Sequence, residues 1–287
     1  MARIVSTGAT LSSPEYRDKK LKERRKKLIL WGSGILLLLL ASIVTLRLER
    51  FKISVVKVEG ANVISEEVVS RNVKETLSGS YLWVVPKANA AIYPRGRVLE
   101  NLEKEFPRFK TASLSLTGPK SIMVSVEERD PYALYCPSAL NPENASDCYF
   151  LDREGFIFDE APAFSGSVYF IYAFSKPLSE SKGSQMIPVE EFKPLSELIE
   201  GLESLHLEPL ALEIGEDEAA LFLKNGAKVL WKMEDDPLKL YSNLEAFLSS
   251  DAIRRDKEFL EKISVLDLRT ENKVFYRFKE DESGMTE

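Results

Sequence analysis

The most regular hydrophobic pattern in the chain is an apolar run that follows a basic segment. Residues 28–46 contain 19 consecutive residues without a charged side chain, and twelve of them are Leu, Ile or Val. As an α-helix, this run is about 28 Å long, which matches the hydrocarbon core of a bilayer. The leucine-rich composition favours insertion. We therefore predict a transmembrane helix over 28–46.

A cleaved signal peptide is the alternative interpretation of this run. Signal peptides have an apolar region of roughly 7 to 15 residues and a small-x-small cleavage site. The run in this chain is longer, and Ala41-Ser42-Ile43 does not provide an Ala-x-Ala site. These differences favour a retained anchor.

A second pattern, over residues 51–129, predicts a small α+β domain. A strand over 53–59 precedes a helix that begins near Ser65, and a second helix ends at Pro107. Alternating apolar residues over 113–126, interrupted by Gly118-Pro119, indicate a β-hairpin. The order strand, helix, helix, strand, strand is typical of a compact unit with helices on a small sheet.

The pattern over residues 130–279 is mostly that of strands, and residues 280–287 form an acidic tail. Candidate strands are 132–136, 148–152, 156–158, 168–174, 263–268 and 274–278. Apolar residues spaced by three or four indicate one helix over 192–205. They indicate another after Asp236-Pro237, where Asp236 is the expected cap and Pro237 the first helical residue. The sequence thus predicts a second, β-rich α+β domain.

Asn225-Gly226 lies between two apolar segments and predicts a two-residue hairpin turn. With such a turn, Phe222 lies opposite Val229 and Ala220 lies opposite Trp231.

Charge predicts the orientation of the anchor. Residues 1–27 carry nine Lys or Arg and three acidic residues. By the positive-inside rule this tail is cytoplasmic and everything after Leu46 is extracytoplasmic. A patch for nucleic acid or anionic lipid is the alternative interpretation of the tail.

The rest of the chain is strongly acidic. It holds the other 30 of 39 basic and 42 of 45 acidic residues, a net charge of −12. This charge argues against a nucleic-acid partner.

Cys136 and Cys148 are the two cysteines, and they flank a loop rich in Pro, Asn and Ser. In an oxidising compartment they are candidates for a disulfide at the base of this loop. A pair of buried free thiols is the alternative.

The chain shows little sign of catalytic chemistry. His206 is the only histidine, and two cysteines beside a hairpin do not form a zinc site without further ligands. Nucleophile-elbow and phosphate-binding motifs are missing from the sequence. We predict no catalytic residue, metal, cofactor or small-molecule substrate, and hence no enzyme. A membrane-tethered hydrolase with paired carboxylates is a further alternative.

Several segments together resemble the FtsQ/DivIB family of bacterial cell-division proteins. The segments are Val55–Ala61, Phe106–Pro131, Tyr149–Gly155 and Val265–Val274, where the last resembles the terminal "VDLR…NGV" element of the family. The resemblance implies a POTRA domain over 51–129 and a β-rich FtsQ-type domain over 130–279.

The resemblance also implies a function. The chain would be a non-catalytic, single-pass assembly protein of the inner membrane at the division septum. Its implied partners are bitopic division proteins of the FtsB/DivIC and FtsL type. POTRA domains also precede outer-membrane barrels, so a polypeptide-translocation component is the alternative.

The last predicted strand is the candidate partner-binding site. It consists of Val274, Phe275, Tyr276, Arg277 and Phe278, and no further strand follows it. If it lies at a sheet edge, its unpaired backbone groups can accept an extended peptide. The alternative is that these aromatic residues only pack on the core.

Overall fold

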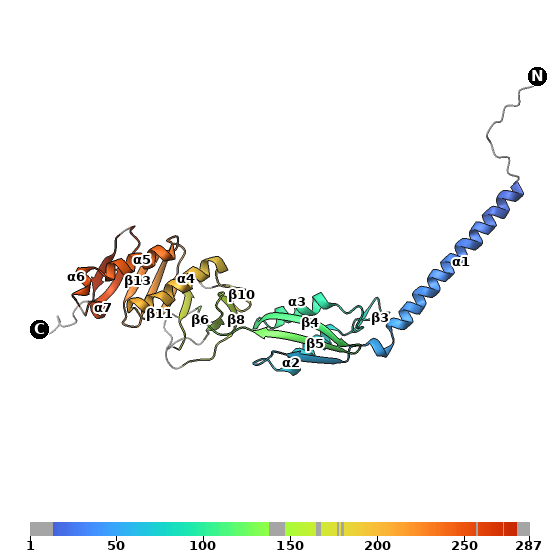
Figure 1. The fold of residues 1–287 in the computed structure, drawn as a ribbon, viewed down its shortest axis with the longest axis horizontal. Coiled ribbons are helices and arrows are strands. Elements are labelled where there is room, and N and C mark those ends of the chain that lie inside the picture. The colour runs from blue at the N-terminus through green and yellow to red at the C-terminus, as the bar shows by residue number, and fades with distance from the viewer. Residues whose placement is uncertain are drawn as a thin grey trace, which may run out of the picture. The chain divides into compact units, whose positions relative to one another are not determined.

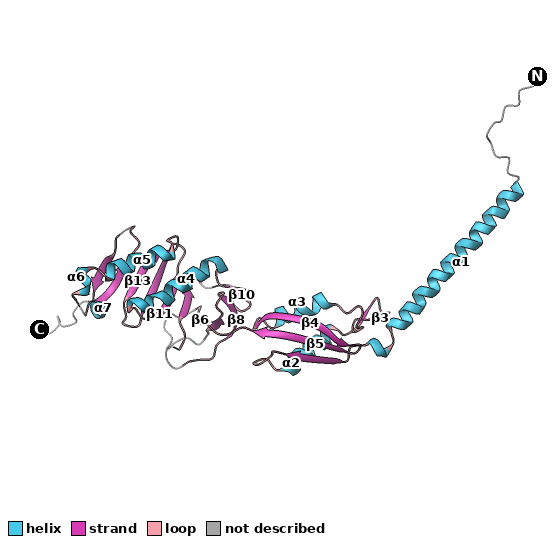
Figure 2. Cartoon of the chain, in the orientation of Figure 1, coloured by secondary structure: helices cyan, strands magenta, loops and turns pink. Residues whose placement is uncertain are grey.

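The structure is a computed structural model that describes residues 14–137, 147–164, 168–176, 178, 181–256, 258–271 and 273–279. The chain has a mixed α+β fold in which an apolar helix precedes a β-rich region (Figures 1 and 2). It divides into two compact units. The first comprises residues 1–101 and 113–125, and the second comprises residues 102–112 and 126–287. The domain limits 51–129 and 130–279 remain predictions.

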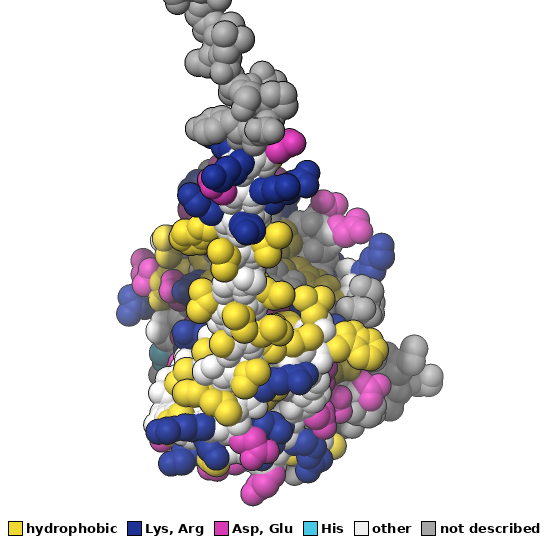
Figure 3. All heavy atoms as spheres, turned by 90° about the vertical axis from the view of Figure 1, so that its right-hand side faces the viewer, with side chains coloured by type: hydrophobic (Ala, Val, Ile, Leu, Met, Phe, Trp, Pro, Cys, Tyr) yellow, Lys and Arg dark blue, Asp and Glu magenta, His cyan; other side chains and the backbone are white. Residues whose placement is uncertain are grey.

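Helix α1 (Pro14–Leu46) contains the predicted span. Within the described ranges it is the one helix long and apolar enough to cross a membrane, and no residue of its most apolar stretch is buried. Figure 3 shows Lys and Arg side chains gathered near its N-terminal end. The hydroxyls of Ser42 and Thr45 each donate to a carbonyl four residues earlier, at 2.8 Å. Polar groups inside the span are thus satisfied within the helix, as a lipid environment requires.

The first unit contains a three-stranded sheet of order β1-β5-β4. Its elements, including those that continue into the second unit, are η1 (Glu49–Phe51), β1 (Val55–Glu59), α2 (Glu66–Thr76), β2 (Ser80–Tyr81), β3 (Val85–Pro86), α3 (Arg95–Glu105), β4 (Phe109–Gly118) and β5 (Ser121–Glu128). The short β2–β3 hairpin was not predicted, because two-residue strands are too short to show an alternating pattern.

Strand β1 runs parallel to β5, with Val58 opposite Val124. Both valines are buried, as are Val69 and Val73 of α2 and Val98 of α3. In α2 the buried valines are four residues apart, so they lie on one face of the helix. This apolar layer forms the core of the unit.

The second unit contains a ten-stranded sheet of order β10-β8-β7-β6-β9-β11-β12-β13-β14-β15. The strands are β6 (Ala133–Tyr135), β7 (Tyr149–Leu151), β8 (Phe156–Glu160), β9 (Ile171–Phe174), β10 (Ser184–Gln185), β11 (Pro209–Ile214), β12 (Glu218–Leu223), β13 (Lys228–Lys232), β14 (Ile263–Asp267) and β15 (Phe275–Phe278). The helices are α4 (Val189–Gly201), η3 (Leu202–Leu205), α5 (Pro237–Leu248), α6 (Asp251–Arg254) and α7 (Phe259–Lys262).

Two apolar clusters form the core of the second unit. The larger joins the helices to the sheet and includes Phe192 of α4, Leu244 of α5 and Trp231 of β13. Asp236 caps α5 as predicted, because its carboxylate accepts the N–H of Leu238 at 2.9 Å. The smaller cluster is built around Phe150 and Phe158, whose rings stack with centroids 6.0 Å apart.

Cys136 and Cys148 are joined by a disulfide, and both belong to the smaller apolar cluster. The bond connects the end of β6 to the start of β7, which are paired neighbours in the sheet. Of the two alternatives for these cysteines, the structure has the bonded pair.

The predicted register of the β12–β13 hairpin is wrong by one residue. Phe222 lies opposite Lys228, and Leu221 lies opposite Val229. The loop has three residues, because the N–H of Gly226 donates to the carbonyl of Leu223 and the N–H of Leu223 donates to the carbonyl of Ala227. Gly226 has a φ of 85°, which is typical of a three-residue turn that ends in a left-handed residue.

Asp152 organises the β7–β8 turn. Its carboxylate accepts the N–H groups of Glu154 and Phe156 at 2.9 and 3.0 Å, and it also binds the guanidinium of Arg129. The turn contains Gly155, which has a φ of 77°. A Cβ at this position would lie 2.7 Å from the ring of Phe192.

These contacts predict different costs for alanine at two glycines. Gly226 also has a positive φ, but a Cβ there would meet no atom within 4 Å. We therefore expect Gly226→Ala to cost about 1 kcal/mol of unfolding free energy from strain alone. Gly155→Ala should cost about 1–3 kcal/mol more, because it also overpacks the core. Chemical denaturation of both variants measures the difference, and equal costs would contradict this account of Gly155.

Candidate functional site: the strand at the end of the ten-stranded sheet

Strand β15 is the last strand in the order of the ten-stranded sheet. It pairs with β14 in antiparallel orientation, with Tyr276 opposite Leu266 and Phe275 opposite Asp267. Val274 precedes the strand and packs against the larger apolar cluster. Within the described ranges no strand lies beyond β15, so four of the five predicted site residues form an edge strand.

The register indicates which backbone groups of β15 face outward. The N–H of Leu268 donates to the carbonyl of Leu230, so the even-numbered residues of β14 direct their backbone groups to β13. The odd-numbered residues then face β15, which makes Asp267 and Phe275 a hydrogen-bonded pair. The N–H and C=O of Tyr276 consequently point away from the sheet.

All four residues of β15 are exposed. The side chain of Tyr276 is 48% exposed and that of Phe275 is 54% exposed. Because side chains alternate along a strand, these two lie on opposite faces of the sheet. A peptide added beside β15 would meet an aromatic side chain on each face.

Tyr276 and Phe278 belong to an aromatic cluster with Phe247 of α5 and Phe259 of α7. The ring centroids of Tyr276 and Phe259 are 5.4 Å apart, and those of Tyr276 and Phe247 are 5.8 Å apart. Phe259 is buried. Tyr276 therefore packs on the core with one side of its ring and remains accessible on the other, and partner binding at this strand stays a prediction.

The end of β15 is held by side chains that the sequence did not indicate. The Nζ of Lys279 donates to the carbonyls of Asn225 and Glu261 at 2.7 and 2.9 Å. The hydroxyl of Ser264 lies 3.1 Å from the carbonyls of Arg277 and Phe278. Backbone contacts of this kind have no composition signal, so only the tertiary structure reveals them.

The connection between β14 and β15 begins at an ion pair. Arg269 binds the carboxylate of Asp267 through Nε and Nη2, at 2.9 and 2.6 Å, and Nη1 contacts Glu218 at 2.9 Å. The hydrogen bonds from Arg269 lower the pKa of Asp267. Asp267 lies directly opposite Phe275, so this pair supports the strand at the point where it enters the sheet.

A second candidate is a polar hollow lined by Tyr132, Phe170, Glu200, Glu203, Pro209 and Lys224. Burial and a 2.9 Å hydrogen bond to Glu200 raise the pKa of Tyr132 to about 12. This phenol stays protonated at neutral pH, which makes it a poor general base. His206 lines an adjoining hollow with an exposed side chain.

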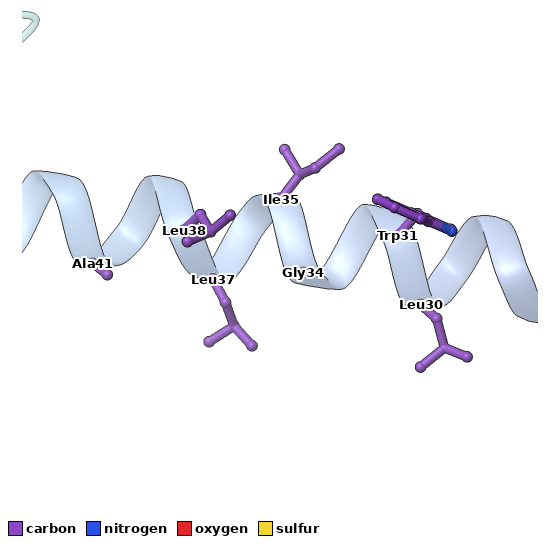
Figure 4. Close-up of a pocket in the computed structure, with 7 residues that line it drawn as sticks. All are labelled: Leu30, Trp31, Gly34, Ile35, Leu37, Leu38 and Ala41. Atoms are coloured by element: carbon purple, nitrogen blue, oxygen red, sulfur yellow. The ribbon is translucent and has the colours of Figure 1, made fainter.

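A third hollow lies along α1 and is lined by Leu30, Trp31, Gly34, Ile35, Leu37, Leu38 and Ala41. Figure 4 shows that all these residues come from one helix, with Trp31 and Ile35 projecting from one side. A helix surface of this composition suits lipid chains and lacks polar groups that would orient a ligand.

The chain gives no match either in a scan against protein-family models or in a search of curated proteins. In the described part of the chain, no group of three or more His, Cys, Asp or Glu residues is placed to hold a metal ion. The candidate site is thus defined by the geometry of β15.

The Asp267–Arg269 pair predicts how acid affects this site. A lowered pKa in the folded state means that the pair stabilises the fold above the ordinary pKa of about 3.9. This stabilisation is lost as the pH falls through the folded pKa. We expect Arg269→Gln to be less stable than the parent chain at pH 7, and the difference to shrink below about pH 4.

Denaturant unfolding at pH 7 and pH 3 measures this difference. Arg277→Gln is a matched control, because Arg277 lies on β15 and has no ion pair in the described residues. A pH-independent difference for Arg269→Gln would contradict the assignment.

Proposed function

We propose that this chain is a non-catalytic, single-pass membrane protein of the bacterial division septum, and that its extracytoplasmic units bind other membrane-anchored division proteins. The resemblance of four segments to the FtsQ/DivIB family supports this proposal. The exposed apolar helix α1 and the α+β region that follows it agree with the same organisation.

The observation that carries the proposal is the exposed edge of β15. The strand ends the ten-stranded sheet, and all of its residues are exposed. An incoming extended segment can add an eleventh strand, in which main-chain hydrogen bonds supply affinity and side-chain contacts supply specificity. Tyr276 and Phe275 are of a residue type that is enriched in interfaces.

The proposed partner segment comes from a bitopic division protein of the FtsB/DivIC or FtsL type. Such a partner is anchored in the same membrane, so its extracytoplasmic segment and this chain meet at high local concentration. A partner strand with moderate intrinsic affinity for β15 is therefore sufficient for binding in the membrane. The large acidic excess of the extracytoplasmic residues favours a partner segment that carries basic side chains.

The proposed topology is based on charge. The basic residues 1–27 stay in the cytoplasm, α1 crosses the inner membrane, and the units after Leu46 are extracytoplasmic. The disulfide between Cys136 and Cys148 agrees with an oxidising location.

Two substitutions at Tyr276 test strand addition. Tyr276→Val removes the ring but keeps the outward N–H, whereas Tyr276→Pro removes both. Proline is tolerated at this edge because the lost N–H does not bond to β14. We expect Tyr276→Pro to bind the partner ectodomain roughly fivefold more weakly than Tyr276→Val, since one hydrogen bond contributes about 1 kcal/mol.

Titration of the purified chain with the partner ectodomain measures these affinities, and thermal unfolding confirms that both variants are folded. Equal affinity of the folded valine and proline variants would rule out strand addition at this position. In cells, a photo-crosslinking residue at Phe275 should capture an FtsB/DivIC-type or FtsL-type protein, and the same residue at the exposed Leu238 of α5 is the control.

The anchor predicts the effect of charge in the middle of α1. Replacing both Leu37 and Leu38 with Arg should disfavour insertion by about 5–7 kcal/mol, because each central Arg costs roughly 2.5–3.5 kcal/mol. The variant should move from the membrane fraction to the soluble fraction. Leu37→Ala with Leu38→Ala is the control and should remain in the membrane. A variant with both arginines that stays in the membrane after alkaline extraction would contradict the proposed span.

A further inference from the structure

The tip of the β2–β3 hairpin carries two large apolar side chains in an unusual backbone conformation. Leu82 has a φ of 45° and Trp83 has a φ of 64°. The N–H of Val84 donates to the carbonyl of Tyr81 at 2.9 Å, which closes a turn with these two residues at its centre. Their side chains are 88% and 94% exposed.

Folding of the chain does not explain this choice of residues. A turn with positive φ at both central positions strongly prefers Asn-Gly or Gly-Gly. Leucine and tryptophan are strained in this conformation, and they gain little from burial against the described residues. Two strained, exposed and strongly apolar residues at one tip indicate that something outside the chain covers them.

The hairpin is bonded to the end of the membrane helix. The Nε of Arg47 donates to the carbonyl of Val84 at 2.6 Å, and Nη2 lies 3.4 Å from the carbonyl of Trp83. The Nδ2 of Asn89 donates to the carbonyl of Leu46 at 2.7 Å. These residues all belong to the first unit, and Figure 1 shows β3 beside the C-terminal end of α1.

This connection sets the depth of the tip relative to a membrane. If residues 28–46 fill a hydrocarbon core of about 30 Å, Leu46 lies at its edge and Arg47 lies in the headgroup layer, which is roughly 5–8 Å thick. The carbonyl of Trp83 is within hydrogen-bonding range of Arg47. The tip therefore lies at the level of the headgroups.

The three tryptophans of the chain fit this placement. Trp231 is buried in the core of the second unit. Trp31 is exposed near the start of the apolar run, and Trp83 is exposed next to its end. Tryptophan is enriched at both membrane–water interfaces, so the two exposed tryptophans correspond to the two interfaces of one span.

We propose that the tip of the β2–β3 hairpin is a second membrane contact, in which Leu82 and Trp83 insert into the headgroup–acyl boundary of the leaflet where α1 emerges. The ligand is the phospholipid surface. This inference rests on the span that is part of the proposed function. With a single membrane-spanning helix, the first unit is free to rotate about the axis of α1. A second membrane contact beside α1 restricts that rotation.

Nitroxide labels on the full-length chain test this proposal. Single cysteines replace Leu82, Leu38 in the span, or Leu238 in α5, and the native disulfide leaves the two natural cysteines unavailable for labelling. The proteins are reconstituted in vesicles of phosphatidylethanolamine and phosphatidylglycerol. The depth of each label is measured from its collision rates with two reagents. Oxygen partitions into lipid, whereas a nickel chelate stays in water.

We expect the Leu82→Cys label to collide more with oxygen than with the chelate, as the Leu38→Cys label does, and the Leu238→Cys label to show the reverse order. A Leu82→Cys label with the aqueous behaviour of Leu238→Cys would overturn the second contact while leaving the span intact. If the Leu82→Cys label collides little with either reagent, the tip is covered by protein, and this result would also overturn the second contact. Aqueous behaviour of Leu38→Cys would instead overturn the span itself.

Discussion

An open β-sheet always leaves unpaired backbone groups on its outermost strands, and this constraint shapes the second unit. The sheet of ten strands does not close, so β15 directs the N–H and C=O of Tyr276 away from β14. Exposed edges of this kind invite pairing with another chain. Neighbouring side chains support this edge. Lys279 binds the carbonyl of Asn225, Ser264 binds the carbonyl of Phe278, and the ring of Phe259 packs against Tyr276. A rigid edge reduces the entropy lost when a partner strand binds.

The proposed function and the further inference place the first unit at the boundary between lipid and water. Helix α1 satisfies its own polar groups and exposes its apolar side chains, while the hairpin next to its end presents Leu82 and Trp83 in a strained turn. Apolar side chains exposed to water are unfavourable, whereas in lipid they are favourable, and for this reason both features support the proposed membrane contacts. The two proposals therefore concern different surfaces, one facing lipid and the other facing a partner strand.

Periodicity in the sequence predicted elements whose signal is local and repeated. The helices α2, α4 and α5 and the hairpin β4–β5 follow their apolar patterns, and Asp236 caps α5 as its position before Pro237 indicates. The turn at Asn225-Gly226 was recognised, but its register was wrong, because the sequence does not distinguish a two-residue loop from a three-residue loop. The β2–β3 hairpin was missed, because two-residue strands carry no period.

By itself, the sequence determined the presence of an apolar helix after a basic tail, the α+β composition of the chain beyond that helix and the aromatic character of the last strand, since each depends on residues close together in the chain. Only the tertiary structure decided that β15 ends the sheet, that Phe247 and Phe259 support Tyr276, and that Arg47 holds the tip of a distant hairpin. Such contacts join residues that are many positions apart, and a pattern along the chain contains no information about which of them will meet.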